Sequence, residues 1–306
     1  MKKVDVSVQS YNKPESLIFT LLTLHKYCRD DIDTVWINDD QSELGVLEKY
    51  NNLKESDALF PWKIKTRVNT KRVGWWVSFC YGRVPKYASI VFLLKRIIWN
   101  FYKNKSFFVD LHDFRYQWAI DNTNKDRLLI IHDDVEFLGN VVGVLRASLR
   151  GQVEPGIAGE LGQCWRCPHK EEGCTPSKIL NGHRPDQFWP MTKKIDGDHK
   201  WACRINEWVV MVNIKVARDI AYSENVFFGN CDDGGDTGAY WFSRLISKNY
   251  SFSDPFMDQN DKNQLFKHWD GGVTGHSAWV DQGDGKNKYN SKKLSDRIYR
   301  EFGYEV

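Results

Sequence analysis

The stretch LLIIHDDVEF, Leu128–Phe137, is the starting point for the fold and the function of this chain. Its first four residues are apolar and predict a buried strand, which stops abruptly at His132, Asp133 and Asp134 before apolar character resumes. Three polar side chains at the end of a buried strand need either a structural or a functional reason.

The rest of the chain alternates strand and helix patterns. Periods of two and of 3.6 residues distinguish them, and a proline and a glutamate mark the start of the first helix. The predicted strands are 4–11, 33–39, 62–69 and 128–134, and the predicted helices are 13–28, 44–53, 114–123 and 141–150. This alternation favours an α/β fold, with a mostly parallel sheet covered by helices on both faces.

Two of these strands end in acidic pairs. Asp39 and Asp40 close the second strand, and Asp133 and Asp134 close the fourth. Parallel strands bring such ends to one edge of the sheet, where ligands bind. Clustered carboxylates repel one another, and a divalent cation relieves that repulsion. The alternative is that these aspartates cap helices or form turns.

The segments VSVQSYNKPESLIFTLLTL, VWINDDQS and RVNTKRVGW resemble those of the GT-A (Rossmann-like) glycosyltransferases, specifically the inverting family 2 group. The resemblance covers roughly Val4 to Tyr250. It implies that Asp39 or Asp40 contacts the base of a bound nucleotide and that Asn69 lies near the donor. It also implies a single GT-A domain over residues 1–306.

Within the resemblance, LLIIHDDVEF occupies the position of the metal motif, which in that family has two aspartates separated by one residue. Here His132 stands in place of the first aspartate. Asp134 is therefore the expected ligand of Mn²⁺ or Mg²⁺, and Asp133 could take the missing role. His132 could contact the ribose, bind the metal as neutral imidazole, or only form a hydrogen bond.

A later histidine often completes the metal site in such folds. FKHWDGGVTGHSAW offers His268 and His276, and we favour His268 because a Gly-Gly turn follows it closely. A structural role for either histidine is the alternative.

The segment NEWVVMVNIKVARDIAYSENVFFGNCDDGGDTGAYWFSRLISKNYSF resembles the second half of the same family. The position of the general base falls on Asp236, with Asp233 and Asp232 as rivals, although Gly235 replaces the usual acid. A carboxylate there could accept a proton from an acceptor hydroxyl. The alternative is that Asp236 only caps the following helix.

The resemblance therefore implies an enzyme that moves a sugar from a nucleotide-sugar to a glycan hydroxyl with inversion. A sugar nucleotidyltransferase is a rival, but QSYNKPES lacks the Gly-rich, basic loop that cradles a triphosphate. A non-catalytic glycan-binding or scaffold protein with this fold is the other rival, which His132 and Gly235 keep open.

A Cys-rich insertion spans about 160–204. It is poor in periodicity, and a structural zinc ion would hold such a long loop together. The expected ligands are Cys164, Cys167, Cys174 and Cys203, with His169 as a substitute. Unrelated thiols or disulfides are the alternatives, and Cys28, Cys80 and Cys231 fit ordinary burial.

A second insertion, about 75–109, is basic and apolar, and it contains no acidic residue from Val77 to Val109. Residues 83–105 could lie flat on a membrane surface, which would suit a lipid-linked glycan acceptor. A buried helix or a dimer contact is the alternative. Residues of about 255–306 form a C-terminal extension.

Charge and cysteine content limit the partners and the compartment. The net charge is only +3, from 43 basic and 40 acidic residues, which does not favour nucleic-acid binding. The start of the chain lacks the apolar core of a signal peptide, and seven cysteines suit a reducing compartment. We therefore expect a cytoplasmic protein, with peripheral contact at the inner face of the membrane as a further expectation.

Overall fold

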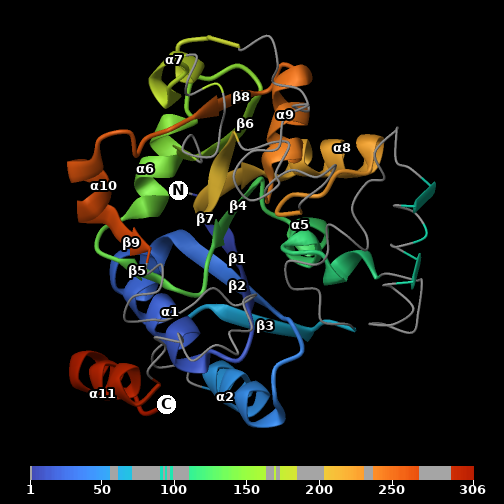
Figure 1. The fold of residues 1–306 in the computed structure, drawn as a ribbon. Helices are drawn as coiled ribbons and strands as arrows, with labels where there is room; N and C mark the ends of the chain where they lie inside the picture. The colour runs from blue at the N-terminus through green and yellow to red at the C-terminus, as the bar shows by residue number, and fades with distance from the viewer. Residues whose placement is uncertain are drawn as a thin grey trace.

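The computed structural model describes residues 2–55, 61–70, 90–91, 94, 97–98, 110–162, 169, 173–184, 203–230, 237–268 and 291–306. In these residues, one seven-stranded sheet has the order β3-β2-β1-β4-β7-β6-β8, and β5 and β9 form a separate two-stranded sheet (Figure 1).

The strands are β1 (Val4–Ser10), β2 (Ile32–Asp39), β3 (Lys63–Val68), β4 (Arg127–Ile131), β5 (Val135–Phe137), β6 (Pro155–Gly162), β7 (Arg204–Asn213), β8 (Ser251–Ser253) and β9 (Phe266–His268). The helices are α1 (Pro14–Cys28), α2 (Leu44–Glu55), α5 (Gln117–Asn122), α6 (Val141–Ser148), α7 (Pro176–Leu180), α8 (Ile214–Glu224), α9 (Ala239–Ser247), α10 (Gln259–Leu265) and α11 (Ser291–Phe302). Two short 3-10 helices are η1 (Arg29–Asp31) and η3 (Leu111–Asp113).

The main sheet is mostly parallel. β1 runs parallel to both β2 and β4, and the pairs β2-β3 and β6-β8 are also parallel. Only β7 runs against its neighbours, β4 and β6. The carboxyl ends of β1, β2 and β4 therefore meet at one edge, as the alternation of strands and helices predicts, and the expected α/β fold class is confirmed.

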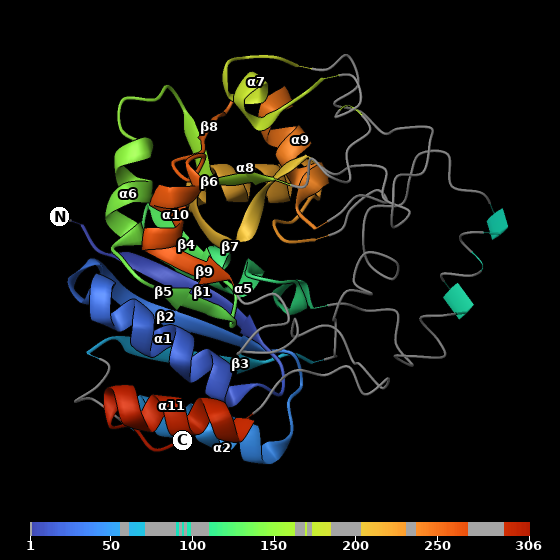
Figure 2. The same cartoon turned by 60° about the vertical axis from the view of Figure 1, so that its left-hand side comes forward.

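Helices cover both faces of the sheet and enclose two apolar cores. α1, α6 and α11 contribute to the core that contains Val6 and Val8 of β1, whereas α5, α8 and α9 contribute to the core that contains Ile130 of β4. Figure 2 shows α1 lying along the sheet with α11 beyond it. Each fully buried aliphatic side chain contributes about 1.5–3 kcal/mol to folding.

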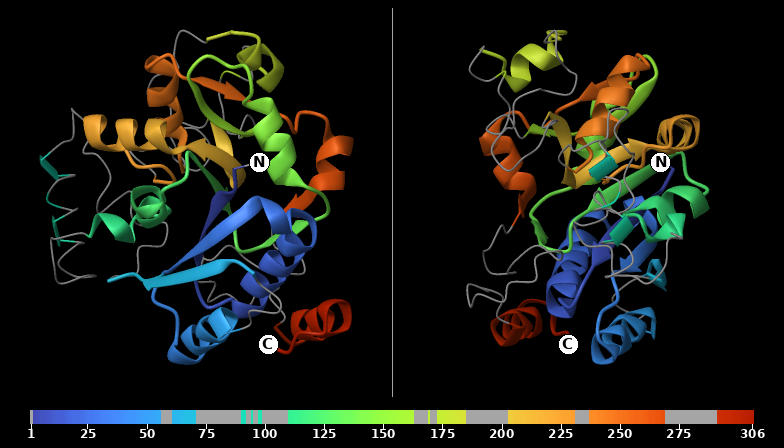
Figure 3. Two further views of the ribbon diagram at one scale, coloured as in Figure 1. Left: turned by 180° about the vertical axis from the view of Figure 1, so that it is seen from behind. Right: turned by 45° about the vertical axis from the view of Figure 1, so that its right-hand side comes forward.

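Described elements beyond Asp254 belong to the same core. β9 pairs with β5, and Leu294 and Ile298 of α11 are fully buried against the core that α1 helps to form. The ring of Phe302 meets Phe19 of α1 edge to face, and α11 lies at the same end of the molecule as α2 (Figure 3).

Two elements differ from their predicted bounds. α5 begins at Gln117 rather than Phe114 because Tyr116 adopts a φ of 60°, a left-handed conformation that does not fit inside an α-helix. The LLIIHDDVEF stretch divides into β4 and β5, and only β4 joins the main sheet. The intervening residues 132–134 therefore form a corner between the two sheets.

The basic insertion is described at only five positions, which are helical. Their apolar side chains are 50–75% exposed, and they are Ile90, Val91, Leu94, Ile97 and Ile98. The remainder of 75–109 lies outside the described residues, so the predicted membrane contact at 83–105 stays a prediction. Among the described residues, no helix is long and apolar enough to cross a bilayer.

The Cys-rich insertion is described in part. Cys174 and Cys203 are half-buried and pack against the core that α8 and α9 share. Cys164 and Cys167 lie outside the described residues, so the predicted zinc site stays a prediction.

Candidate metal centre

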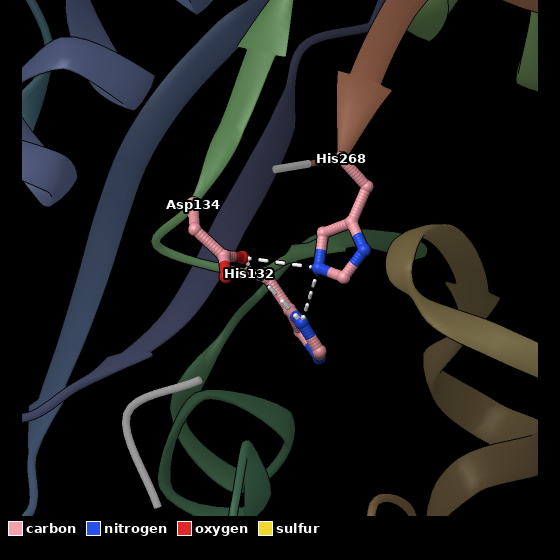
Figure 4. A group of neighbouring side chains, drawn as sticks. All are labelled: His132, Asp134 and His268. Atoms are coloured by element: carbon pink, nitrogen blue, oxygen red, sulfur yellow. Dashed lines mark hydrogen bonds and ion pairs between the residues drawn. The ribbon is translucent and has the colours of Figure 1, made fainter. Parts of the chain in front are cut away.

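Three side chains converge beyond the carboxyl end of β4. The Nδ1 atom of His132 lies 3.2 Å from Nε2 of His268, which in turn lies 3.1 Å from Oδ1 of Asp134. The third distance, from His132 Nδ1 to Asp134 Oδ1, is 3.8 Å. Figure 4 shows that the three side chains point toward one another, His132 and Asp134 from the corner between β4 and β5 and His268 from the end of β9.

Pairing of β5 with β9 explains how residues more than a hundred positions apart meet. Val135 lies opposite His268 in the antiparallel register, so Asp134 is placed beside the end of β9. The backbone N–H of His132 donates to the carbonyl of Trp208 at 3.1 Å. The indole of Trp208 also stacks on the His268 ring, with centroids 4.8 Å apart, so one residue of β7 positions both histidines.

A buried glutamate faces the other nitrogen of His132. Nε2 of His132 lies 3.4 Å from Oε1 of Glu207, which also pairs with Arg115 at 3.0 Å. Burial opposes ionisation of Glu207, but Arg115 and His132 outweigh it and lower the pKa of its carboxyl. An ionised Glu207 favours the tautomer with the proton on Nε2, which leaves Nδ1 as a lone-pair donor toward Asp134 and His268.

Asp134 is held ionised in the same way. Burial raises its pKa, but His268 and Lys13 outweigh burial, and the resulting pKa lies well below the usual aspartate range. Its charged form is therefore ready to accept a cation.

Asp133 has a different environment. Its carboxylate accepts a hydrogen bond from Ser10 at 2.9 Å and lies 3.4 Å from Nζ of Lys13, a buried lysine. Burial raises the pKa of Asp133 despite the nearby Lys13. The structure therefore does not bring Asp133 into the group formed by His132, Asp134 and His268.

The three convergent residues fit a divalent transition-metal ion. One ligand atom from each lies within 4.8 Å of the others, and the set comprises two imidazole nitrogens and one carboxylate oxygen. Imidazole suits transition metals, whereas Mg²⁺ prefers ligands that are all oxygen. The structure thus places His132, as well as Asp134 and His268, in this group, where its Nδ1 also lies within hydrogen-bonding distance of His268.

The acidic pair of β2 lies at the same edge of the sheet and is hydrogen-bonded within the protein. Both carboxylate oxygens of Asp39 accept from Ser42, from its N–H at 2.7 Å and from its hydroxyl at 2.5 Å. Asp40 accepts from the side-chain amide of Asn69 at 3.0 Å. Burial raises the pKa of Asp39 above its ordinary value. Asp39 thus holds the turn that follows β2 through its two hydrogen bonds with Ser42. The side chain of Asn69 is hydrogen-bonded to that of Asp40.

Gln9 has an unusual position between these two groups. It lies near the end of β1, between β2 and β4, and is only 2% exposed. Neither atom of its side-chain amide has a hydrogen-bond partner in the described part of the structure. A buried amide with unmade hydrogen bonds is costly unless a ligand supplies them.

The predicted general base lies just outside the described residues, as do Asp232, Asp233 and His276. The chain on either side of Asp236 is nevertheless fixed: Gly238 N–H donates to the carbonyl of Asn230 at 2.8 Å. The hydroxyl of Thr237 lies 3.4 Å from Nη1 of Arg115. The N-cap residue of α9 is Gly238, and Asp236 itself lies outside the described residues, so both readings of Asp236 stay predictions.

Sequence reasoning missed Glu207, Trp208 and Arg115. A signal was present for the first of these, because the NEWVVMVN strand begins with Asn206 and Glu207 where a fully buried strand would be apolar, and both side chains are buried. Nothing in the local sequence distinguishes Trp208 or Arg115 from the chain's other aromatic and basic residues.

No protein-family model matches the chain, and no curated protein matches it. Solved structures similar to it include the mannosyltransferase PcManGT from Pyrobaculum calidifontis in complex with GDP-Man and Mn²⁺, at 12% identity and a TM-score of 0.44. That match covers 83% of this chain, which spans only about half (54%) of the PcManGT chain.

Two further similar structures are also glycosyltransferases. The galactosyltransferase LgtC, in complex with donor and acceptor sugar analogues, is 8% identical with a TM-score of 0.44, over 96% of this chain and 94% of that chain. Core-mannan synthase A from Aspergillus fumigatus, in a Mn/GDP form, is 9% identical with a TM-score of 0.42, over 100% of this chain and 86% of that chain.

Proposed function

We propose that this protein is a metal-dependent glycosyltransferase that moves a sugar from a nucleotide-sugar donor to a hydroxyl group of a glycan. The observation that carries the proposal is the convergence of His132, Asp134 and His268 at the carboxyl edge of an α/β sheet. Ligands bind at this edge in open α/β sheets.

His132, Asp134 and His268 would hold the cation, and the two imidazoles favour Mn²⁺ over Mg²⁺. A bound cation would stabilise the negative charge that develops on a nucleoside diphosphate as it leaves. We assign Asp133 a structural role, because Ser10 and Lys13 already satisfy its carboxylate.

The nucleotide would lie across the ends of β1 and β2. Gln9 offers a buried amide with unmade hydrogen bonds, and a nucleoside has both donors and acceptors that can pair with it. Asp40 and Asn69 are hydrogen-bonded to each other at the same edge of the sheet as Gln9. This position is consistent with the donor-binding role that the family resemblance implies for them. Asp39 would shape this region through its turn with Ser42.

Asp236 would act as the general base of an inverting transfer, with Asp233 as the alternative. Its carboxylate would accept the proton of the acceptor hydroxyl as that oxygen bonds to the anomeric carbon and the bond to the diphosphate breaks. Support comes from the neighbouring Thr237, since Arg115 lies between Thr237 and Glu207, which faces His132. These contacts connect Thr237, the residue after the proposed base, to His132 of the metal centre.

The acceptor and the attachment to a membrane are finer parts of the proposal. Five exposed apolar residues between Ile90 and Ile98 stand in a segment that is rich in Lys and Arg and lacks acidic residues. Such a helix suits the interface of an anionic membrane, where a lipid-linked glycan would be within reach. A zinc ion bound by Cys164, Cys167, Cys174 and Cys203 is a separate structural proposal.

The test is nucleotide release from UDP-, GDP-, dTDP- and CMP-sugars by the purified full chain with Mn²⁺. We expect release from one nucleotide class, its loss in Asp134→Ala and Asp236→Asn, and no change in Asp261→Ala, which alters an exposed aspartate of α10. Donor binding without turnover would favour the non-catalytic alternative. Absence of both binding and release in well-folded protein would reject the proposal.

A further inference from the structure

A basic cavity lies at the end of the sheet opposite the metal centre. It has a volume of about 580 Å³ and opens where β1, β2 and β4 begin and where α6 ends. Six cationic residues line it: Lys2, Lys3, Lys125, Arg127, Arg146 and Arg150. Small-molecule sites typically have volumes of roughly 300–1,000 Å³, so this cavity is large enough for a ligand.

Positive charge exceeds negative charge in this cavity. Its two lining carboxylates, Asp33 and Asp126, are already paired with Lys125 at 2.8 Å and with Lys2 at 3.1 Å. Asp31, which does not line the cavity, pairs with Arg146. Six cationic side chains therefore line the cavity against two carboxylates.

Arg127 supplies a second, independent observation. It is the first residue of β4, and its Nη1 atom is buried with no hydrogen-bond partner in the described residues. Burial and the nearby Arg146 lower the pKa of Arg127, although the adjacent Asp126 opposes this shift, so the charge of Arg127 is less well solvated than that of a surface arginine. A bound anion would satisfy the donor and offset the repulsion between the two guanidinium groups.

Helix stabilisation explains the presence of only some of the cationic residues that line the cavity. Cations at the carboxyl end of a helix stabilise its dipole, which accounts for Arg146 and Arg150 near the end of α6. It does not account for Arg127 or Lys3, which lie at the start of β4 and just before β1.

We propose that this cavity binds a phosphate-bearing anion at a site separate from the metal centre. The guanidinium fork of arginine matches the geometry of phosphate oxygens, and the flanking lysines add charge without demanding a particular orientation. Arg127 begins β4 and His132 directly follows its end, so the two lie five positions apart, or roughly 17 Å at about 3.3 Å per residue. A diphosphate bound at one end therefore does not reach the other.

The test is calorimetric titration of the full chain with inorganic pyrophosphate in the presence of EDTA. We expect binding with a Kd of about 1 mM or lower at low salt. Arg127→Gln should weaken pyrophosphate binding about ten-fold or more, because it removes the charged guanidinium group and its buried Nη1 donor. Asp134→Ala and Lys215→Gln, a control on the exposed face of α8, should bind as the wild type does.

Two further arms make the outcome decisive. If Arg127→Gln does not fold, the pair Lys3→Gln with Arg150→Gln replaces it, since both side chains are exposed. Sedimentation with vesicles of phosphatidylglycerol and phosphatidylcholine, against phosphatidylcholine alone, distinguishes a lipid headgroup from a free phosphate compound. Arg127-dependent binding to either probe supports the proposal. Absence of binding to both, equal binding by Arg127→Gln, or loss in Asp134→Ala instead would overturn it.

Discussion

His132 Nε2 lies 3.4 Å from the carboxylate of Glu207, on the side of the ring opposite the nitrogen that faces His268. Outer partners of this kind fix the orientation and the tautomer of a ligating histidine. We therefore predict that Glu207→Gln weakens Mn²⁺ binding by about 10–100-fold, the usual effect of removing such a partner. Calorimetric titration with Mn²⁺ measures it.

Glu43→Gln is the matched control, because it makes the same chemical change at an exposed position. It should leave Mn²⁺ affinity unchanged. If Glu207→Gln bound Mn²⁺ as tightly as wild type, the carboxylate would have no part in preparing His132.

The stack of Trp208 on His268 predicts a graded series. Trp208→Phe keeps an aromatic ring over the imidazole but loses the hydrogen bond from Nε1 to Glu160, which is 2.9 Å long. Trp208→Ala removes both contacts, so His268 gains rotamer freedom. We expect near-normal Mn²⁺ affinity for Phe and a loss of about ten-fold for Ala. Equal affinities for all three proteins would mean that the stack does not position His268.

Ile298 tests whether α11 is part of the fold. Its side chain is fully buried, so Ile298→Ala should lower the free energy of unfolding by about 2–5 kcal/mol. Tyr299→Ala, at the 65% exposed neighbouring position, should change it by less than about 0.5 kcal/mol. Urea denaturation of both variants measures the difference, and similar small effects would mean that α11 is not docked in solution.

Asp254 gives the protein a predicted pH dependence. Burial raises the pKa of Asp254 to about 6, even though it accepts hydrogen bonds from the N–H groups of Leu161 and Phe256. The unfolded value is about 3.9, so the folded state binds more protons between these two values. The contribution of Asp254 to stability is therefore full below about pH 4 and is lost as the pH rises through about 6.

Urea unfolding of wild type and Asp254→Asn from pH 4 to 8 measures this effect. We expect wild type to lose stability relative to the variant as the pH rises to about 6, with a constant difference above it. A difference that is independent of pH would show that Asp254 titrates at its ordinary value.

Four strands of the main sheet, β1 to β4, could be predicted from the sequence because their patterns are local. Predicted strand 33–39 became Ile32–Asp39, and predicted helix 13–28 became Pro14–Cys28. Parallel pairing of β1 with β2 and β4 then brought the acidic strand ends to one edge, as expected.

The metal group was only partly predictable. Asp134 and His268 were named because each stood in a recognisable motif, but their contact depends on the pairing of two three-residue strands, β5 and β9, which no local pattern specifies. Glu207 and Trp208 contact His132 and His268, which are far from them in the sequence, and short-range sequence patterns do not encode such contacts. The carboxylate of Asp133 contacts Ser10 and Lys13 instead of joining the metal group, and Lys13 is a buried lysine that sequence alone would place at the surface.

Anomalous diffraction at the manganese edge, from crystals of the full chain grown with MnCl₂, shows directly whether His132, Asp134 and His268 bind the ion. We predict one strong peak bounded by Nδ1 of His132, the carboxylate of Asp134 and Nε2 of His268. A peak at a different group of residues, or none at these three in folded protein at saturating Mn²⁺, would contradict it.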